Sequence, residues 1–298
     1  MRTDCLNPAM RVCLMVEGQE GVEWQQWLAL AEAAEAAGLE GLFRSDHYQA
    51  IGRASPAGSL DAWTTLAGLA ARTRTLRLGT MVSPVTFRPA AVLAKNVVTV
   101  DHISSGRAEL GIGAGWFERE HEAYGFPFLT TRARLDELDR QLEEITRQWT
   151  EADDIWPKPV QQPRPPIIVG GTAKPRTVRA AVRFADEYNT VFPTIDEARE
   201  RKQILDAAAR SAGREPLVYS MMIGCLVGRD SGDFERRRQR FADAVGGNEP
   251  PVRGTVDEVV EQLRAYEAVG VTRVMLQHLL HDDLEMVALL GDVAARLH

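Results

Sequence analysis

His47 is the residue of this 298-residue sequence best suited to proton transfer. It follows Asp46 at the end of the apolar run 39–45, and an imidazole exchanges its proton close to neutral pH. We predict that His47 acts as a general acid or base. The alternative is that its ring only fixes the position of a loop.

A glycine-rich turn, GIGAGW, occupies residues 111–116. It is not the dinucleotide-binding fingerprint GxGxxG, because Trp116 stands where the third glycine belongs and because that fingerprint normally follows the first strand. Two interpretations stay open. Either the turn needs glycine for positive φ angles, or the backbone here approaches a ring system closely.

A second glycine-rich turn, GGTAKP, occupies residues 170–175. It follows an apolar run and opens a helical pattern, and the free N–H groups at the start of a helix attract anions. The turn lacks the GK[ST] ending of a Walker A motif. The sequence therefore predicts phosphate binding, and the alternative is an ordinary helix start at which Thr172 and Lys174 are merely solvated.

Motifs for other catalytic chemistries are missing from the sequence. Residues 118–122, EREHE, lack the HExxH spacing of zinc proteases, and the apolar run 11–16 has no histidine for the HxH pair of hydrolytic metal barrels. There is no GxSxG motif, and no cysteine lies at the end of a predicted strand beside a candidate base. We predict no metal site and no serine or cysteine nucleophile.

Short apolar runs alternate with longer amphipathic segments along the chain. The apolar runs predict strands at 11–16, 39–45, 75–84, 107–116, 165–172, 186–193, 217–228 and 271–277. The amphipathic segments predict helices at 24–37, 62–72, 89–103, 131–149, 175–185, 196–212, 233–244, 256–269 and 283–297. Eight strand–helix units predict the α/β class and a single (β/α)8 TIM barrel over residues 10–298. In such a barrel, His47 and both glycine-rich turns are expected at the rim formed by the carboxyl ends of the strands.

Composition limits the classes of partner and location. Lys+Arg 35 against Asp+Glu 42 gives a net charge of −7, which offers no electrostatic attraction for nucleic acid or an anionic membrane. No apolar run approaches the roughly 18 residues that a membrane span needs. Residues 1–9 predict a flexible extension rather than a signal peptide, with the natural start at Met1 or Met10. The widely spaced Cys5, Cys13 and Cys225 predict a cytoplasmic protein without disulfides or structural zinc.

An ordered set of motifs resembles the bacterial luciferase-like monooxygenases. The motifs are LFRSDH at 42–47, LGTMV at 78–82, TFRP at 86–89, DHISSGR at 101–107, GIGAGW at 111–116 and IVGG at 168–171. The resemblance runs from about residue 10 to the end of the chain. GWFEREH at 115–121, with Tyr124 and Gly125, is similar to the coenzyme F420-dependent oxidoreductase branch.

The resemblance implies a luciferase-like barrel that holds a flavin or deazaflavin at its rim. It implies a non-prolyl cis peptide between Met81 and Val82, behind the ring, and it places Asp46 and His47 beside the reactive edge. The cofactor-binding residues implied are Asp46, Met81, Val82, Gly113, Ala114, Gly170, Gly171 and Thr172.

We therefore predict an oxidoreductase that uses reduced coenzyme F420 for hydride transfer to or from a small organic substrate. His47 is the first candidate for proton transfer, and Glu120 and His121 are further catalytic candidates. One alternative is an FMN-dependent monooxygenase that works with a separate flavin reductase. Another is a flavin-binding paralogue without catalysis.

Three further expectations come with the resemblance. Trp116 replaces a glutamate found in F420-dependent sugar-phosphate dehydrogenases, so that acid role is not inherited. The stretch 150–166 is shorter than usual in the family, which predicts an open site. As in most of the superfamily we expect a homodimer, and the scarcity of polar residues in the helix at 62–71 suggests where the two copies pair.

Overall fold

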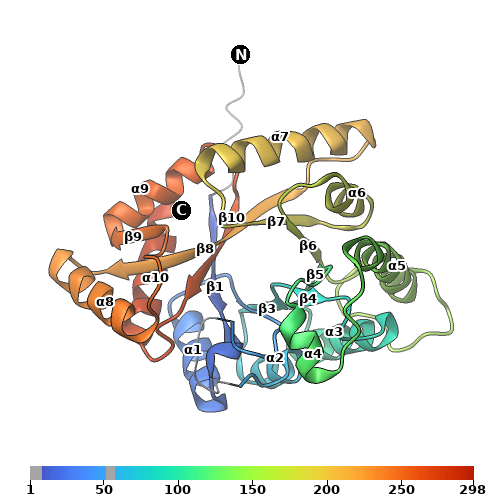
Figure 1. Cartoon of the computed structure of the whole chain (residues 1–298), viewed down its shortest axis with the longest axis horizontal. Coiled ribbons are helices and arrows are strands. Elements are labelled where there is room, and N and C mark those ends of the chain that lie inside the picture. The colour runs from blue at the N-terminus through green and yellow to red at the C-terminus, as the bar shows by residue number, and fades with distance from the viewer. Residues whose placement is uncertain (1–8, 52–57) are drawn as a thin grey trace.

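Eight parallel strands close into a barrel surrounded by helices in the computed structural model (Figure 1). The structure describes residues 9–51 and 58–298. The barrel strands are β1 (Arg11–Val16), β2 (Gly41–Arg44), β3 (Arg77–Thr80), β5 (Ala108–Gly113), β6 (Ile167–Gly171), β7 (Glu187–Val191), β8 (Val218–Gly228) and β10 (Arg273–His278). β10 pairs in parallel with both β1 and β8, and these pairings close the sheet. The predicted (β/α)8 barrel is confirmed.

The predicted strand at 75–84 is interrupted near its carboxyl end. β3 ends at Thr80, the peptide bond between Met81 and Val82 is cis, and pairing resumes in β4 (Ser83–Pro84), which lies against β5. The cis peptide implied by the family resemblance is confirmed at the expected bond. Residues 81 and 82 leave the strand ladder and face a cavity at the rim of the barrel.

Helices cover the outside of the barrel. They are α1 (Trp24–Ala36), α2 (Ala62–Arg72), α3 (Ala90–Ser104), α4 (Glu118–Tyr124), α5 (Thr131–Thr150), α6 (Pro175–Phe184), α7 (Ile195–Ser211), α8 (Ser231–Ala244), α9 (Val256–Glu267) and α10 (Leu284–Leu297). Thr194 and Thr255 start α7 and α9 with capping boxes. Two short elements were not predicted: α4 and the strand β9 (Val252–Thr255), which pairs with the carboxyl half of β8. Each is too short to show a clear hydrophobic period in the sequence.

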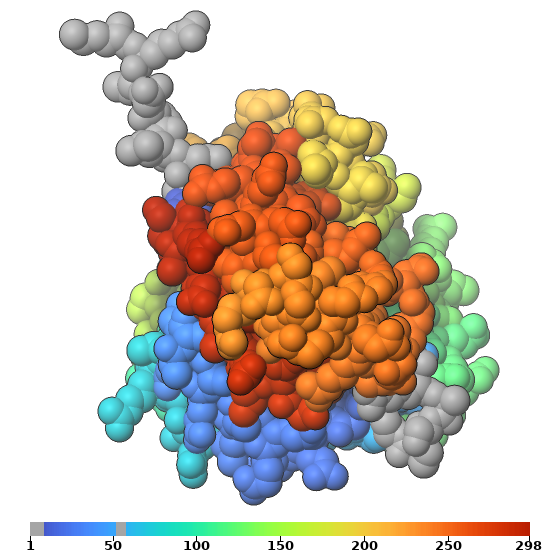
Figure 2. Space-filling view, turned by 90° about the vertical axis from the view of Figure 1, so that its left-hand side faces the viewer, coloured from blue at the N-terminus to red at the C-terminus, as the bar shows by residue number. Residues whose placement is uncertain are grey.

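The two ends of the described chain meet where the barrel closes. Figure 2 shows this side of the molecule, with α10 (red) beside α1 (blue). The two helices approach closely at Gly291, where an added Cβ would lie 2.5 Å from the carbonyl oxygen of Ala37. This contact joins sequence segments that lie far apart along the chain.

Alternating strand residues form two buried layers. Leu14 packs in the layer between strands and helices, whereas Met15 and Met275 belong to a separate cluster inside the barrel. Arg273 of β10 forms a buried ion pair with Glu109 of β5. These side chains fill the interior of the barrel, and the cavity lies at its rim.

The apolar residues of α2 are used within the chain. Trp63 and Leu66 are buried, and Nε1 of Trp63 donates a hydrogen bond to the Ser83 hydroxyl at 3.0 Å. Ala71, on the other side of the helix, is exposed. The scarcity of polar residues in this helix therefore does not by itself mark an interface, and the homodimer stays a prediction.

The segment 150–166 lies along α3 and the start of β5. The Asp101 carboxylate accepts hydrogen bonds from the N–H groups of Val160 and Gln161 at 2.7 and 3.1 Å, and the Gln161 amide donates to the Ala108 carbonyl at 2.7 Å. No residue of this segment lines the rim cavity. The segment therefore does not contribute to that cavity, and the open site expected from its shortness stays a prediction.

No helix in the described part of the chain is long and apolar enough to cross a membrane. The predicted extension over residues 1–9 lies outside the described residues except for Ala9, and Cys5 lies outside them as well.

Candidate active site

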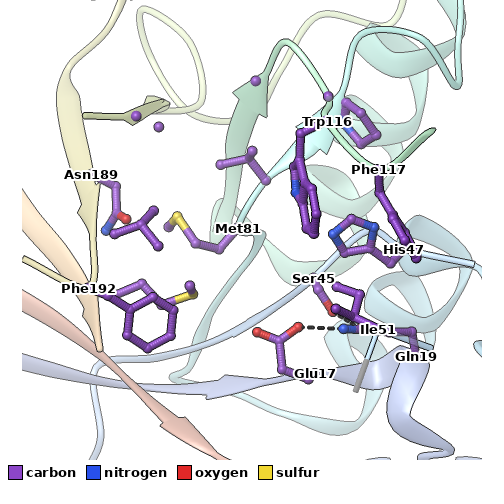
Figure 3. Close-up of a pocket in the computed structure, with 18 of the residues that line it drawn as sticks. Glu17, Gln19, Ser45, His47, Ile51, Met81, Trp116, Phe117, Asn189 and Phe192 are labelled. Carbon is purple, nitrogen blue, oxygen red and sulfur yellow. Dashed lines mark hydrogen bonds between the residues drawn. The ribbon is translucent and has the colours of Figure 1, made fainter. Parts of the chain in front are cut away.

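A cavity of about 730 Å³ opens at the carboxyl ends of the barrel strands. Most of the predicted site residues line it: His47, Met81, Val82, Gly113, Ala114, Glu120, His121, Gly170, Gly171 and Thr172. Trp116 and Phe117 stand on one side and Phe192 on the other (Figure 3). The fold thus brings both glycine-rich turns and His47 together at one rim, as the barrel interpretation required.

His47 and Glu120 form a pair at the cavity wall. Nδ1 of His47 lies 3.0 Å from Oε1 of Glu120, whose side chain is fully buried. The other carboxylate oxygen accepts hydrogen bonds from the backbone N–H groups of Tyr48 and Gln49. Burial alone would lower the pKa of His47, but the hydrogen bond and charge of Glu120, with smaller effects from nearby carboxylates, raise it above its ordinary value. The imidazole therefore keeps its proton to a higher pH than an isolated histidine does.

His121 has both ring nitrogens engaged in hydrogen bonds. Nδ1 lies 2.7 Å from the carbonyl oxygen of Phe117 and must carry the proton, because a carbonyl only accepts. Nε2 lies 2.6 Å from the Thr86 hydroxyl. This arrangement fixes the turn that leads into α4, and proton transfer by His121 would require one of these bonds to break.

Asp46 does not line the cavity. Its buried carboxylate accepts hydrogen bonds from Arg88 at 2.6 and 3.2 Å and from the Ser83 hydroxyl at 2.6 Å. Arg88 also binds Asp61 and Tyr48. The structure thus places Asp46 behind His47, where it ties the loop after β2 to β4, rather than beside the reactive edge of a ring.

The glycines of β5 and β6 make room for the segment after β3. A Cβ added at Gly113 would lie 2.7 Å from a methyl group of Val82, and one at Gly170 would lie 3.3 Å from the other. A Cβ at Gly111 would lie 2.0 Å from the Thr80 carbonyl oxygen. Close packing of Val82 and Thr80 against these strands accounts for the glycines, so they are not by themselves evidence of a bound ring.

The turn after β6 has the features of an anion site. α6 begins at Pro175, and Thr172, Lys174 and Thr177 line the adjacent part of the cavity. The N–H groups of the first helical turn have no partner within the helix, and they attract negative charge together with the Lys174 ammonium. The predicted phosphate site remains a prediction.

Several cavity residues lie outside the predicted catalytic and cofactor-binding sets. Glu17, directly after β1, accepts hydrogen bonds from the side-chain amides of Gln277 and Gln19 at 2.7 and 2.8 Å, and Gln19 accepts one from Ser45. All four residues line the cavity. Glu17 and Gln277 stand at the carboxyl ends of predicted strands, and this position was the only signal that could have found them.

Asn189 in β7 offers an unsatisfied acceptor to the cavity. Its amide nitrogen donates to the Ser220 hydroxyl at 2.8 Å. Its oxygen is buried and has no hydrogen-bond partner among the described residues. A buried polar atom without a partner is costly in a folded protein, so Asn189 suits a ligand that brings an N–H group. Among the described residues, no group of three or more His, Cys, Asp or Glu side chains is arranged to hold a metal ion.

Comparison with known proteins places the chain in a family. Residues 10–253 match the luciferase-like monooxygenase family. The chain belongs to this family. An uncharacterized protein from Mycobacterium tuberculosis is 34% identical over 173 residues, which cover 53% of this chain and 59% of that protein.

This luciferase-like protein is similar both to an FMNH2-dependent enzyme and to an F420-dependent enzyme. The FMNH2-dependent dimethylsulfone monooxygenase of Pseudomonas putida is 27% identical over 77% of this chain and 65% of its own length. An F420-dependent secondary alcohol dehydrogenase, solved with an F420–acetone adduct, has the same fold with a TM-score of 0.79 and 16% identity, covering 97% of this chain and 99% of the other. The aligned region spans less than two thirds of the length of these two curated relatives. The chain is thus a member of the luciferase-like monooxygenase family, while its activity, cofactor and substrate are left for a proposal.

Proposed function

We propose that this protein uses reduced coenzyme F420 for hydride transfer to or from a small organic substrate. The observation that carries the proposal is the His47–Glu120 pair, which lines the same cavity as the cis peptide at Met81–Val82. Reduction of a C=O, C=N or activated C=C bond by hydride also needs a proton at the second atom. A histidine whose pKa is raised by a buried carboxylate can supply that proton.

The residues of the cavity fit a flavin-like ring with a phosphorylated side chain. The unsatisfied oxygen of Asn189 would accept a hydrogen bond from a ring N–H. Thr172, Lys174 and Thr177 at the start of α6 would hold a phosphate. When bound there, F420 supplies the hydride, and the protein supplies binding, orientation and the proton.

His47 would exchange its proton through Nε2. Nδ1 faces Glu120, so Nε2 is the nitrogen on the opposite edge of the ring. Glu120 stabilises the imidazolium and keeps the ring in one orientation, because its second oxygen is held by two backbone N–H groups. Apolar groups of Met81, Val82 and Trp116 limit the access of water to the reacting atoms.

A second candidate function is an FMN-dependent monooxygenase supplied with reduced flavin by a separate reductase. It is favoured by the similarity to the P. putida monooxygenase over 77% of this chain. The acceptor of Asn189 and the anion site at α6 suit FMN equally well, because both cofactors carry a ring N–H and a phosphate.

Cofactor titration separates the two candidates. Purified protein is titrated with F420 and with FMN, and binding is followed by cofactor fluorescence; oxygen consumption is then measured with each reduced cofactor. We expect F420 to bind and its reduced form to leave oxygen unconsumed. Micromolar binding of FMN without binding of F420, with oxygen consumed in the presence of reduced FMN, would establish the monooxygenase instead. Tight binding without turnover over a broad substrate panel would indicate a paralogue without catalysis.

A further inference from the structure

Glu17 presents a buried carboxylate to the cavity. It lies directly after β1, its side chain is only 8% exposed, and in Figure 3 its carboxylate points into the cavity between Phe192 and His47. Its position therefore allows direct contact with a molecule bound at the rim.

The partners of Glu17 orient the carboxylate without neutralising it. Oε1 accepts from Gln277 and Oε2 from Gln19, and both donors are neutral amides. Within residues 9–51 and 58–298, no arginine, lysine or histidine forms an ion pair with Glu17. A carboxylate oxygen can accept more than one hydrogen bond, and each oxygen of Glu17 accepts one from these two amides. Both oxygens can therefore accept a further hydrogen bond from a ligand. His47 and Arg44 interact with Glu17 through their charge but do not pair with it directly. Burying a carboxylate without a directly paired cation is costly, and a cationic ligand in contact with it would offset part of that cost.

The other charged groups of the cavity do not compete for this role. Glu120 is paired with His47, and Lys174 stands at the start of α6, among the residues suited to a phosphate. Glu20 also lines the cavity, and its carboxylate accepts a hydrogen bond from the Ile51 N–H at 2.8 Å. Aromatic rings of Trp116 and Phe192 line the same cavity as Glu17. Rings of this kind attract cations through their faces, and a carboxylate beside aromatic rings is well suited to an organic cation.

We propose that Glu17 binds a cationic nitrogen of the substrate, either an alkylammonium or a protonated ring nitrogen. The inference rests on the proposed function only in placing the substrate in the cofactor cavity. It narrows the substrate class from any small organic molecule to nitrogen bases that are protonated at neutral pH.

The test compares two probes of equal size, benzylamine, which is protonated at neutral pH, and benzyl alcohol, which is neutral. Their dissociation constants are measured by calorimetry on wild-type protein saturated with F420. We expect benzylamine to bind about tenfold more tightly or better, as expected for a charge-assisted contact. Equal binding, or tighter binding of the alcohol, overturns the inference without any variant being needed.

Two variants assign the preference to Glu17. Glu17→Gln should bring the two probes to similar affinity, while Glu20→Gln, which removes the same charge from the same cavity, should keep most of the preference. F420 affinity and the melting temperature are measured on each sample. If Glu17→Gln weakens F420 binding and leaves the probe preference intact, Glu17 belongs to the cofactor and the inference fails. Absence of F420 binding to the wild type would refute the proposed cofactor instead, and the probe comparison is then run on the protein saturated with FMN.

Discussion

At the scale of single residues, His47 is expected to affect chemistry more than binding. We predict that His47→Ala lowers turnover by about 10²–10⁴-fold, because a general acid is lost, while the dissociation constant for F420 changes little. Steady-state kinetics and F420 fluorescence titration check both quantities. The exposed His102 provides a matched control as His102→Ala. If a folded His47→Ala protein keeps the wild-type rate, His47 is not a general acid and its role is structural.

Glu120 should set the pH range of the reductive reaction. Burial lowers the pKa of His47, but the bond to Glu120 and its charge outweigh burial and raise the pKa overall. The donor is protonated below that pKa, so the rate of reduction should be full at low pH and fall as pH rises through it. Glu120→Gln removes the main raising effect and should move this fall to lower pH. A pH–rate profile that does not move would contradict the role of the pair.

His278 in β10 is expected to make stability depend on pH. The ring is fully buried, neither nitrogen has a hydrogen-bond partner among the described residues, and burial lowers its pKa from 6.5 to about 4. The unfolded chain therefore binds the proton more readily, and stability is full above about pH 6.5 and declines as pH falls toward about 4. The loss from this group is about 3 kcal/mol, since one pKa unit corresponds to about 1.4 kcal/mol.

Urea unfolding at several pH values tests this prediction. His278→Leu should flatten the difference in unfolding free energy between pH 7 and pH 5 relative to the wild type, whereas the exposed His102→Gln should not. If His278→Leu keeps the full pH dependence, other groups cause it.

At the scale of elements, Gly171 and Tyr188 hold the turn between β6 and the start of α6 in place. The Tyr188 hydroxyl accepts a hydrogen bond from the Ala173 N–H at 2.8 Å, and a Cβ at Gly171 would lie 2.8 Å from that same hydroxyl. We predict that Gly171→Val displaces this turn and weakens F420 binding more than tenfold, since each charge-assisted hydrogen bond lost costs about 1.5–3 kcal/mol. Melting temperature and the dissociation constant are measured on the same sample. A lower melting temperature with unchanged affinity would mean that the turn is only structural.

At the scale of the whole molecule, we expect a homodimer. The prediction rests on the family, because α2 buries Trp63 and Leu66 within its own chain and leaves no long apolar stripe as a guide. Sedimentation velocity at tens of micromolar measures the mass directly. A monomer at that concentration contradicts the prediction.

The sequence by itself determined the barrel and the location of its reactive rim. Apolar runs and amphipathic segments act over short distances, and so do single residues such as Gly38, just after the predicted helix 24–37, and Pro175, at the start of the predicted helix 175–185. Their pattern therefore predicts the strands and helices without knowledge of the fold. The position of the cis peptide at Met81–Val82 came from the family resemblance and is confirmed. Once eight strand–helix units are recognised, the carboxyl ends of the strands must converge, which is why most of the predicted residues line one cavity.

Only the tertiary structure decided which residues are partners. Asp46 and His47 are neighbours in sequence, yet one binds Arg88 behind the cavity and the other faces Glu120 at its wall. Glu17 and Gln277 are 260 residues apart and meet because β1 and β10 pair where the barrel closes. Such contacts depend on strand register and side-chain direction across the closed barrel, and short-range sequence patterns carry no information about either.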